Sequence, residues 1–339
     1  MLKTVTMKDI AMKLGVSTVT VSKALTDKEG VGDELRATIK EVAKQMGYRY
    51  TIGAKTQKTG KSYNIGIILE SHYVDVQNDA FYMKMYQNII KILAKSNYSG
   101  IMELIKQEMM KEAIMPNILV ENKVDGIIVL GQIKSEYLKM VRDSEIPIVY
   151  LDFYDRQMEV DSIITDSVYG TYMLTNYIVS NGHTKIAFVG SIHATASILD
   201  RFLGYYRSLL VNNIPFREDY VISDRGDDGL FIELDLPEDM PTAFVCNCDE
   251  LAYILMEKLK AKGYRIPEDI SVVGFDNYTF AGYSSPRLTT VEVNVEAMAQ
   301  TAVETLIKRI LGEKYIQGRR VISGNLIIRD SVADISKHQ

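Results

Sequence analysis

Polar residues follow three of the apolar segments that the sequence predicts as buried strands. Asp152 follows Val-Tyr-Leu, Asn247 and Asp249 follow Phe-Val-Cys, and Asp276 and Asn277 follow Val-Gly-Phe. Carboxylate and amide groups can hold the hydroxyl groups of a small polar ligand by hydrogen bonds. One aspartate in such a position is commonly the N-cap of the next helix. The recurrence of these residue types after three strands favours a ligand-binding site.

The elements that would position these residues alternate along the chain. Short apolar or β-branched runs are separated, in nearly all cases, by amphipathic helical stretches, and they occur at 65–69, 99–104, 126–130, 146–151, 186–189, 243–246 and 270–275. This rhythm predicts parallel sheets with helices on both faces, and enough strands for two lobes. Since ligands of open α/β sheets bind beyond the carboxyl ends of the strands, the polar residues are expected at a binding site.

The N-terminus shows a different pattern, which predicts a helix-turn-helix between residues 6 and 25. It combines capping hydroxyl residues, a glycine suited to a tight turn and apolar residues at helical spacing, namely Thr6, Ile10, Ala11, Leu14, Gly15 and Ser17. An ordinary pair of amphipathic helices would have a similar pattern. In a helix-turn-helix, Thr18, Val19 and Lys23 would point outward and reach base edges in the major groove of DNA.

The charge of the chain is unevenly distributed. The net charge is -5, but residues 1–62 carry 12 Lys and Arg against 6 Asp and Glu, a local net charge of +6. The remainder carries 27 basic against 38 acidic residues, a net charge of -11. A basic module on an acidic body is typical of a protein that contacts DNA at one end.

Other features exclude several classes of protein. No apolar run approaches the length of a membrane span and residues 1–13 lack the apolar core of a signal peptide, so we expect a cytoplasmic protein with no membrane contact. Cys246 and Cys248 are interpreted as buried thiols, without a disulfide or a metal. His183 and His193 have no nucleophile in a recognisable motif, so we expect no catalytic residues, no cofactor and no enzyme.

The N-terminal pattern, with a third helix predicted over 31–48, resembles the DNA-binding headpiece of the LacI/GalR (lactose-repressor) family of bacterial transcription regulators. The matching residues there are Thr6, Asp9, Ala11, Gly15, Val16, Ser17, Thr20, Val21, Ser22, Val31, Arg36, Gly47 and Tyr48. The resemblance continues through nearly the whole chain in Asp125-Gly126, Leu151-Asp152, Gly182-His183, Arg201, Gly204-Tyr205, Asn247-Cys248-Asp249, Gly274-Phe275-Asp276 and 286–291.

The resemblance implies an α/β fold, with an N-terminal all-α headpiece and a two-lobed body like that of periplasmic binding proteins. The headpiece would span 1–49, a hinge 50–63 and the effector-binding and dimerisation domain 64–339. The N-lobe would comprise about 64–163 and 293–322, and the C-lobe about 164–292 and 323–335. A small molecule would lie between the lobes, held by Asp152, Arg201, Asn247 and Asp276, with Phe81 and Tyr82 as an aromatic platform. Phe81 could equally be a core residue.

DNA contacts are expected from the headpiece and the hinge. Thr6, Ser17, Thr20 and Ser22 would hold phosphates, in addition to the base contacts of Thr18, Val19 and Lys23. In the family, the hinge folds into a short helix on DNA and a leucine wedges into the minor groove. Ala54 matches the family, but Gln57 occupies the position of the leucine, so we expect weaker DNA bending.

The sequence therefore predicts a repressor of carbohydrate-utilisation genes that binds a palindromic operator as a homodimer. Its effector would be a mono- or oligosaccharide that binds two conformations unequally. Three alternatives remain open. The first is a corepressor-dependent regulator, such as a purine sensor, or a global catabolite regulator docking a phosphoprotein. The second is a sugar-binding receptor, and the third is a sugar-modifying enzyme.

Overall fold

The computed structural model describes residues 7–25, 28–46, 61–75, 80–155, 159–226 and 229–336. The chain divides into two compact units, Met1–Ser62 and Tyr63–Gln339, which we call the headpiece and the body. Within the described ranges, no helix combines the length and the apolar character needed to cross a membrane.

The described part of the headpiece contains three helices, α1 (Met7–Leu14), α2 (Thr18–Leu25) and α3 (Asp33–Gln45). The helices share a small apolar core that includes Ile10, Val21 and Ile39, each with no exposed surface. Between α1 and α2, Gly15 has φ +65°, which glycine adopts at little cost. The predicted helix-turn-helix is confirmed. Helix α3 begins at Asp33, two residues later than predicted, and residues 47 and 48 at its predicted end lie outside the described residues.

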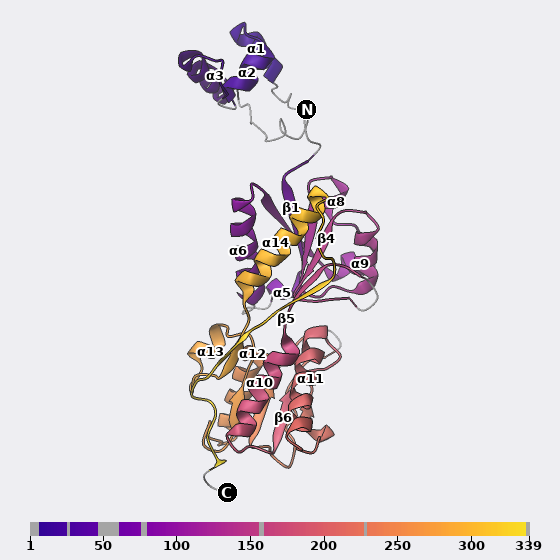
Figure 1. Cartoon of the computed structure of the whole chain (residues 1–339), viewed down its shortest axis with the longest axis vertical. Coiled ribbons are helices and arrows are strands. Elements are labelled where there is room, and N and C mark those ends of the chain that lie inside the picture. Colours follow the sequence, from indigo (N-terminus) through magenta and orange to yellow (C-terminus); the bar gives the residue numbers. More distant parts are fainter. Residues whose placement is uncertain are drawn as a thin grey trace. The chain divides into compact units, whose positions relative to one another are not determined.

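The N-lobe of the body is built on a six-stranded parallel sheet with the strand order β11-β5-β4-β3-β1-β2. Its strands are β1 (Asn64–Glu70), β2 (Ser99–Ile105), β3 (Gly126–Leu130), β4 (Ile148–Leu151), β5 (Ser162–Thr165) and β11 (Arg319–Ile322). Helices α6 (Ala80–Lys95) and α14 (Val295–Leu311) cover one face, and α8 (Asn117–Val120) and α9 (Ser135–Arg142) cover the other (Figure 1). Short helices α5 (His72–Asp75) and α7 (Gln107–Lys111) follow β1 and β2.

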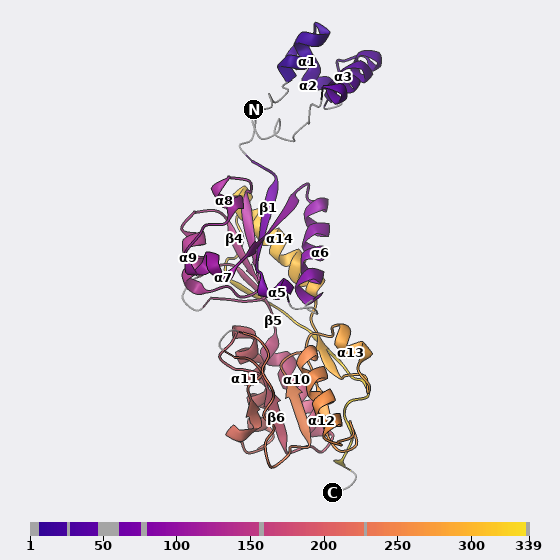
Figure 2. The same ribbon diagram turned by 180° about the vertical axis from the view of Figure 1, so that it is seen from behind.

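The C-lobe has a four-stranded parallel sheet with the order β7-β6-β8-β9. Its strands are β6 (Ile186–Val189), β7 (Val221–Ile222), β8 (Ala243–Cys246) and β9 (Ser271–Val273). Helices α10 (Ser167–Ser180) and α11 (Ala196–Val211) pack on one face, α12 (Asp249–Ala261) packs on the other, and the short α13 (Thr279–Tyr283) follows β9 (Figure 2). A 3-10 turn, η1 (Glu218–Tyr220), precedes β7. Gly204 allows α10 and α11 to cross closely, because a Cβ there would lie 2.2 Å from the Val168 carbonyl oxygen.

The chain passes between the lobes three times: from β5 to α10, from β10 (Thr290–Glu292) to α14, and from β11 to β12 (Asn325–Ile327). Strands β10 and β12 pair with each other in antiparallel fashion beside the C-lobe helix α10. The seven strands predicted from the sequence are confirmed, but β5, β7, β10, β11 and β12 were not predicted. These strands are only two to four residues long, and β11 is an edge strand that begins with two arginines.

Candidate effector-binding cleft and DNA-binding face

A cleft that is partly open to solvent lies between the two lobes of the body, and its cavity volume is about 120 Å³. Residues from both lobes line it, including all of those predicted from the sequence to bind an effector: Phe81, Tyr82, Asp152, Arg201, Asn247 and Asp276.

Arg201 on α11 lies at the centre of the C-lobe side of the cleft. Its guanidinium group donates from Nη1 to the Asn247 carbonyl oxygen at 2.5 Å and pairs through Nη2 with Asp276 Oδ1 at 3.1 Å. The group also stacks over the Phe275 ring, 4.1 Å from its centroid. Arg201 is only 7% exposed, and its Nε has no hydrogen-bond partner among the described residues. A buried donor without a partner is unusual in a folded protein and suits a site that a ligand completes.

The N-lobe side of the cleft combines a carboxylate with aromatic rings. The Tyr82 hydroxyl donates to Asp152 Oδ2 at 3.0 Å, across 70 positions of sequence. The Tyr82 ring also lies 4.6 Å from that of Tyr73 and 5.3 Å from that of Phe81, between ring centroids. Phe81 is half-buried and lines the cleft, so it takes part both in the packing and in the wall.

Two of the aspartates in the cleft have an uncommon backbone conformation. Asp152 has φ 71° and Asp276 has φ 108°, and both directly follow the apolar segments that carry β4 and β9. L-residues adopt positive φ at a cost of about 1 to 3 kcal/mol, and such residues concentrate at functional sites. We therefore interpret the positive φ of Asp152 and Asp276 as strain that is retained because it places both carboxylates in the wall of the cleft.

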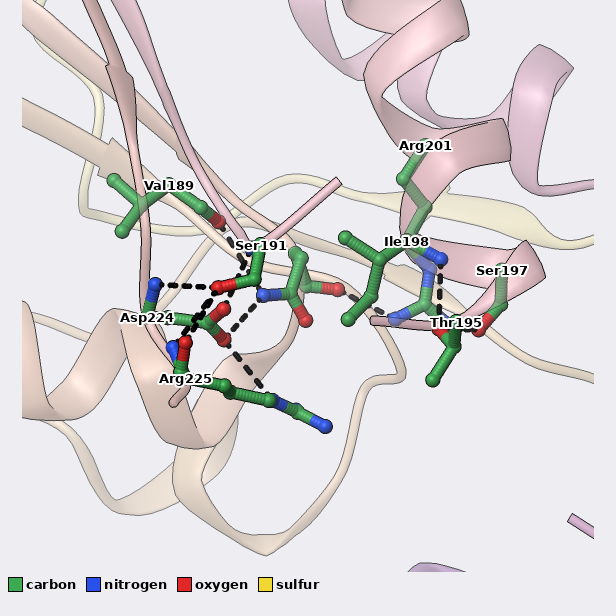
Figure 3. A network of polar contacts seen from close by, with 9 residues as sticks. Val189, Ser191, Thr195, Ser197, Ile198, Arg201, Asp224 and Arg225 are labelled. Atoms are coloured by element: carbon green, nitrogen blue, oxygen red, sulfur yellow. Dashed lines mark hydrogen bonds and ion pairs between the residues drawn. The ribbon is translucent and has the colours of Figure 1, made fainter. Parts of the chain in front are cut away.

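A buried polar network next to Arg201 contains two residues that were not predicted from the sequence, Asp224 and Arg225 (Figure 3). Asp224 has no exposed surface, and it accepts hydrogen bonds from the Ser191 backbone N–H at 2.6 Å and from Asn247 Nδ2 at 2.8 Å. Arg225 Nε donates to Asp224 Oδ2 at 3.2 Å, and Arg225 lines the cleft. Both residues follow β7, a strand of two residues, which is too short to be recognised from a sequence pattern.

Asp249, also in the wall of the cleft, has a structural role. It is 1% exposed and accepts hydrogen bonds from the Thr290 hydroxyl at 2.6 Å and the Tyr278 backbone N–H at 2.8 Å. Burial, followed by the nearby charge of Asp276, raises the pKa of Asp249 well above its usual range. Burial also raises the pKa of the Cys248 thiol to about 12, which makes it a poor nucleophile at neutral pH.

Among the described residues, no three His, Cys, Asp or Glu side chains are placed together so that they could hold a metal ion. His183 is 2% exposed, and its ring nitrogens lie 3.0 Å from the Thr242 hydroxyl and the Ala333 carbonyl oxygen. It joins the C-terminal segment to the C-lobe and does not line the cleft.

The headpiece presents the start of α2 to solvent. Ser17 caps this helix, because its Oγ accepts from the Thr20 backbone N–H at 3.0 Å and lies 2.8 Å from Thr20 Oγ1. Thr18 and Val19 are exposed, Val19 by 63%, whereas Thr20, Ser22 and Lys23 are half-buried. Thr6, Ala54 and Gln57 lie outside the described residues.

Two parts of the chain match known protein families. Residues 6–50 match the family described as bacterial regulatory proteins, lacI family, and residues 175–332 match the periplasmic binding protein-like domain. The chain is 31% identical over 311 residues to the HTH-type transcriptional repressor PurR of Vibrio atlanticus (strain LGP32), covering 90% of this chain and 92% of that protein.

Solved structures share the fold over almost the full length. The lac repressor dimer bound to operator and the anti-inducer ONPF aligns with a TM-score of 0.79 at 22% identity, covering 98% of this chain and 100% of that one. The transcriptional regulator CelR in complex with cellobiose aligns with a TM-score of 0.69 at 21% identity, covering 96% and 99%. The chain belongs to the LacI family of bacterial regulatory proteins, and it is a DNA-binding transcriptional repressor rather than an enzyme.

Proposed function

We propose that this repressor binds a palindromic operator as a homodimer and controls carbohydrate-utilisation genes in response to a small sugar in the interlobe cleft. The observation that carries the proposal is the convergence of Asp152, Arg201, Asn247 and Asp276 on one cleft from both lobes. Carboxylates, an amide and a planar guanidinium can bind adjacent hydroxyl groups in bidentate fashion. We place its action in the cytoplasm, where operator DNA is found.

The aromatic residues support a sugar over a flat heteroaromatic corepressor. The Tyr73 and Tyr82 rings are inclined by 53°, and those of Phe81 and Tyr82 by 79°. Such rings can cover the apolar face of a sugar, whereas a purine held between rings would require two parallel faces. The observed angles therefore favour the sugar.

Coupling between the cleft and DNA follows from its position between two lobes. A ligand that contacts Asp152 on one lobe and Arg201 on the other binds the lobe orientations unequally, and so shifts their populations. We propose that residues 50–63, including Ala54 and Gln57, form the hinge that transmits this shift to the headpieces. Thr18, Val19 and Lys23 would then read base edges, while Thr6, Ser17, Thr20 and Ser22 hold phosphates.

The experiment is the selection of genomic fragments by the purified full-length protein, followed by sequencing of the bound DNA. Enrichment of one palindrome beside sugar-uptake and glycosidase genes is expected, with release of that DNA by a sugar of the same pathway. Palindromes scattered across the genome would indicate a global regulator instead. DNA binding that requires or increases with an added purine would identify a corepressor-dependent regulator.

A further inference from the structure

Arg225 introduces a second cation into the cleft, beside Arg201. Its Nε donates to Asp224, whose carboxylate is fixed by the Ser191 backbone and the Asn247 side chain. The Arg225 guanidinium also lies over the Phe231 ring, 5.0 Å from its centroid. The side chain is therefore held from both its Nε edge and one face before any ligand arrives.

The terminal nitrogens of Arg225 point away from Asp224 (Figure 3). Neither Nη1 nor Nη2 hydrogen-bonds to any residue in the described part of the chain, and the side chain is 20% exposed. Arg225 lines the cleft together with Tyr73 of the opposite lobe, so the group faces the space between the lobes. A guanidinium held at Nε presents two parallel N–H groups at its far edge, which match the two oxygens of a carboxylate or phosphate.

The carboxylates that line the same cleft are mostly engaged. Asp276 pairs with Arg201, Asp152 accepts from the Tyr82 hydroxyl, and Asp249 accepts from the Thr290 hydroxyl and the Tyr278 backbone N–H. Glu250 also lines the cleft on the C-lobe side. The cleft thus combines the outward N–H edge of the Arg225 guanidinium, whose charge is balanced by buried Asp224, with carboxylate oxygens that can accept hydrogen bonds from ligand hydroxyls.

We propose that the effector is a polyhydroxylated anion, namely a sugar acid or a sugar phosphate, and that Arg225 selects it by binding its anionic group. This inference rests on the proposed sugar-binding function of the same cleft. Arg225 would be the residue that determines specificity, while Asp152, Asn247 and Asp276 bind the hydroxyl groups shared by neutral and acidic sugars.

The test compares matched ligands on the full-length protein by isothermal titration calorimetry. Glucuronate and galacturonate represent the acids, glucose 6-phosphate and galactose 1-phosphate the phosphates, and glucose and galactose the neutral sugars. One acid or phosphate is expected to bind about 10- to 100-fold more tightly than its neutral parent, the usual gain from a charge-assisted contact. Tighter binding of a sugar acid would identify the anionic group as a carboxylate, and tighter binding of a sugar phosphate would identify it as a phosphate.

Variants of Arg225 then test whether this residue causes the tighter binding of the anion. In Arg225→Gln the anion and its neutral parent are expected to bind about equally. Arg225→Lys is expected to retain part of the preference for the anion, because lysine keeps a point charge. Arg217→Gln is the matched control, because Arg217 is a C-lobe arginine paired with Asp219 and Asp239 outside the cleft. The control should keep the full preference.

Two results would overturn the proposal, and they differ in what else they affect. If neutral sugars bind as tightly as the anions, or if the preference survives in Arg225→Gln, the role of Arg225 is wrong while the sugar effector stands. If none of the probes binds to the wild-type protein, the sugar effector itself is wrong, and the inference fails with it.

Discussion

At the scale of single residues, Arg201 combines a proposed ligand contact with structural support. It holds the Asn247 backbone and neutralises Asp276, both of which line the cleft. Removal of Arg201 would remove the ion pair that this residue makes with the Asp276 carboxylate, whose side chain is 16% exposed. Loss of one member of such a buried pair is costly because the remaining charge stays poorly solvated.

We therefore expect Arg201→Ala to abolish the response to effector while operator affinity stays within about threefold. The same change should lower the free energy of unfolding by about 3 kcal/mol. The double variant Arg201→Ala/Asp276→Asn should recover part of that stability but no effector response, since it also removes the carboxylate charge that Arg201 balanced. Urea unfolding and operator titration by fluorescence anisotropy measure the two effects. Loss of operator binding by a folded Arg201→Ala protein would contradict this division of roles.

His183 gives the stability of the body a dependence on pH. Burial lowers the pKa of His183 from its ordinary value of 6.5. Below pH 6.5 the unfolded chain protonates this imidazole before the folded protein does. The contribution of His183 is thus complete above pH 6.5 and is lost as the pH falls below it.

We expect the wild-type protein to lose up to about 1.4 kcal/mol more stability than His183→Gln between pH 7.5 and pH 5.5. Because the chain has no tryptophan, unfolding is followed by circular dichroism. Equal losses in both proteins would show that His183 does not titrate in this range.

At the scale of elements, the start of α2 has two tasks that can be separated. The Ser17 hydroxyl satisfies the Thr20 backbone N–H, and the same residue lies on the exposed face that we propose for phosphate contact. Aspartate also caps helices well, but its charge repels phosphate.

Ser17→Ala should therefore destabilise the headpiece by about 1 kcal/mol, whereas Ser17→Asp should keep its stability. For operator binding the ranking is reversed: Ser17→Asp should bind the operator about tenfold or more weakly than Ser17→Ala at low salt, because its charge repels phosphate. Operator titration and thermal unfolding of the full-length variants check this prediction. If the Ser17→Asp variant binds the operator like the wild type, this face lies away from the phosphates.

At the scale of the whole molecule, the charge is segregated between a headpiece segment with net charge +6 and a remainder with net charge -11. Two headpieces on a dimer would read two half-sites at a fixed distance and rotation around the DNA.

Insertion of five base pairs at the centre of the palindrome rotates one half-site by about half a turn. We expect this insertion to lower operator affinity by about 100-fold or more, because only one headpiece can then engage. The same insertion outside the palindrome is the control. Unchanged affinity on the interrupted palindrome would show that single headpieces bind independently.

Much of this architecture could be predicted because it depends on local sequence. The turn at Gly15, the cap at Ser17 and the alternation of apolar and amphipathic segments involve residues a few positions apart. Polar residues at strand ends could also be identified, since parallel strands place their carboxyl ends at one edge of a sheet. Family resemblance added Arg201, which periodicity alone would not have singled out.

The sequence by itself determined the helix-turn-helix, the charged headpiece and the parallel α/β body, because these follow from periodicity and composition. Tertiary structure alone decided how the cleft is built. The Arg201–Asp276 pair joins residues 75 positions apart, the Tyr82–Asp152 contact spans 70, and Asn247 meets Asp224 across 23. Arg225 enters the cleft after a strand of two residues, with no local pattern to mark it. Such contacts depend on the packing of separate elements against each other, and that information is distributed over the whole chain.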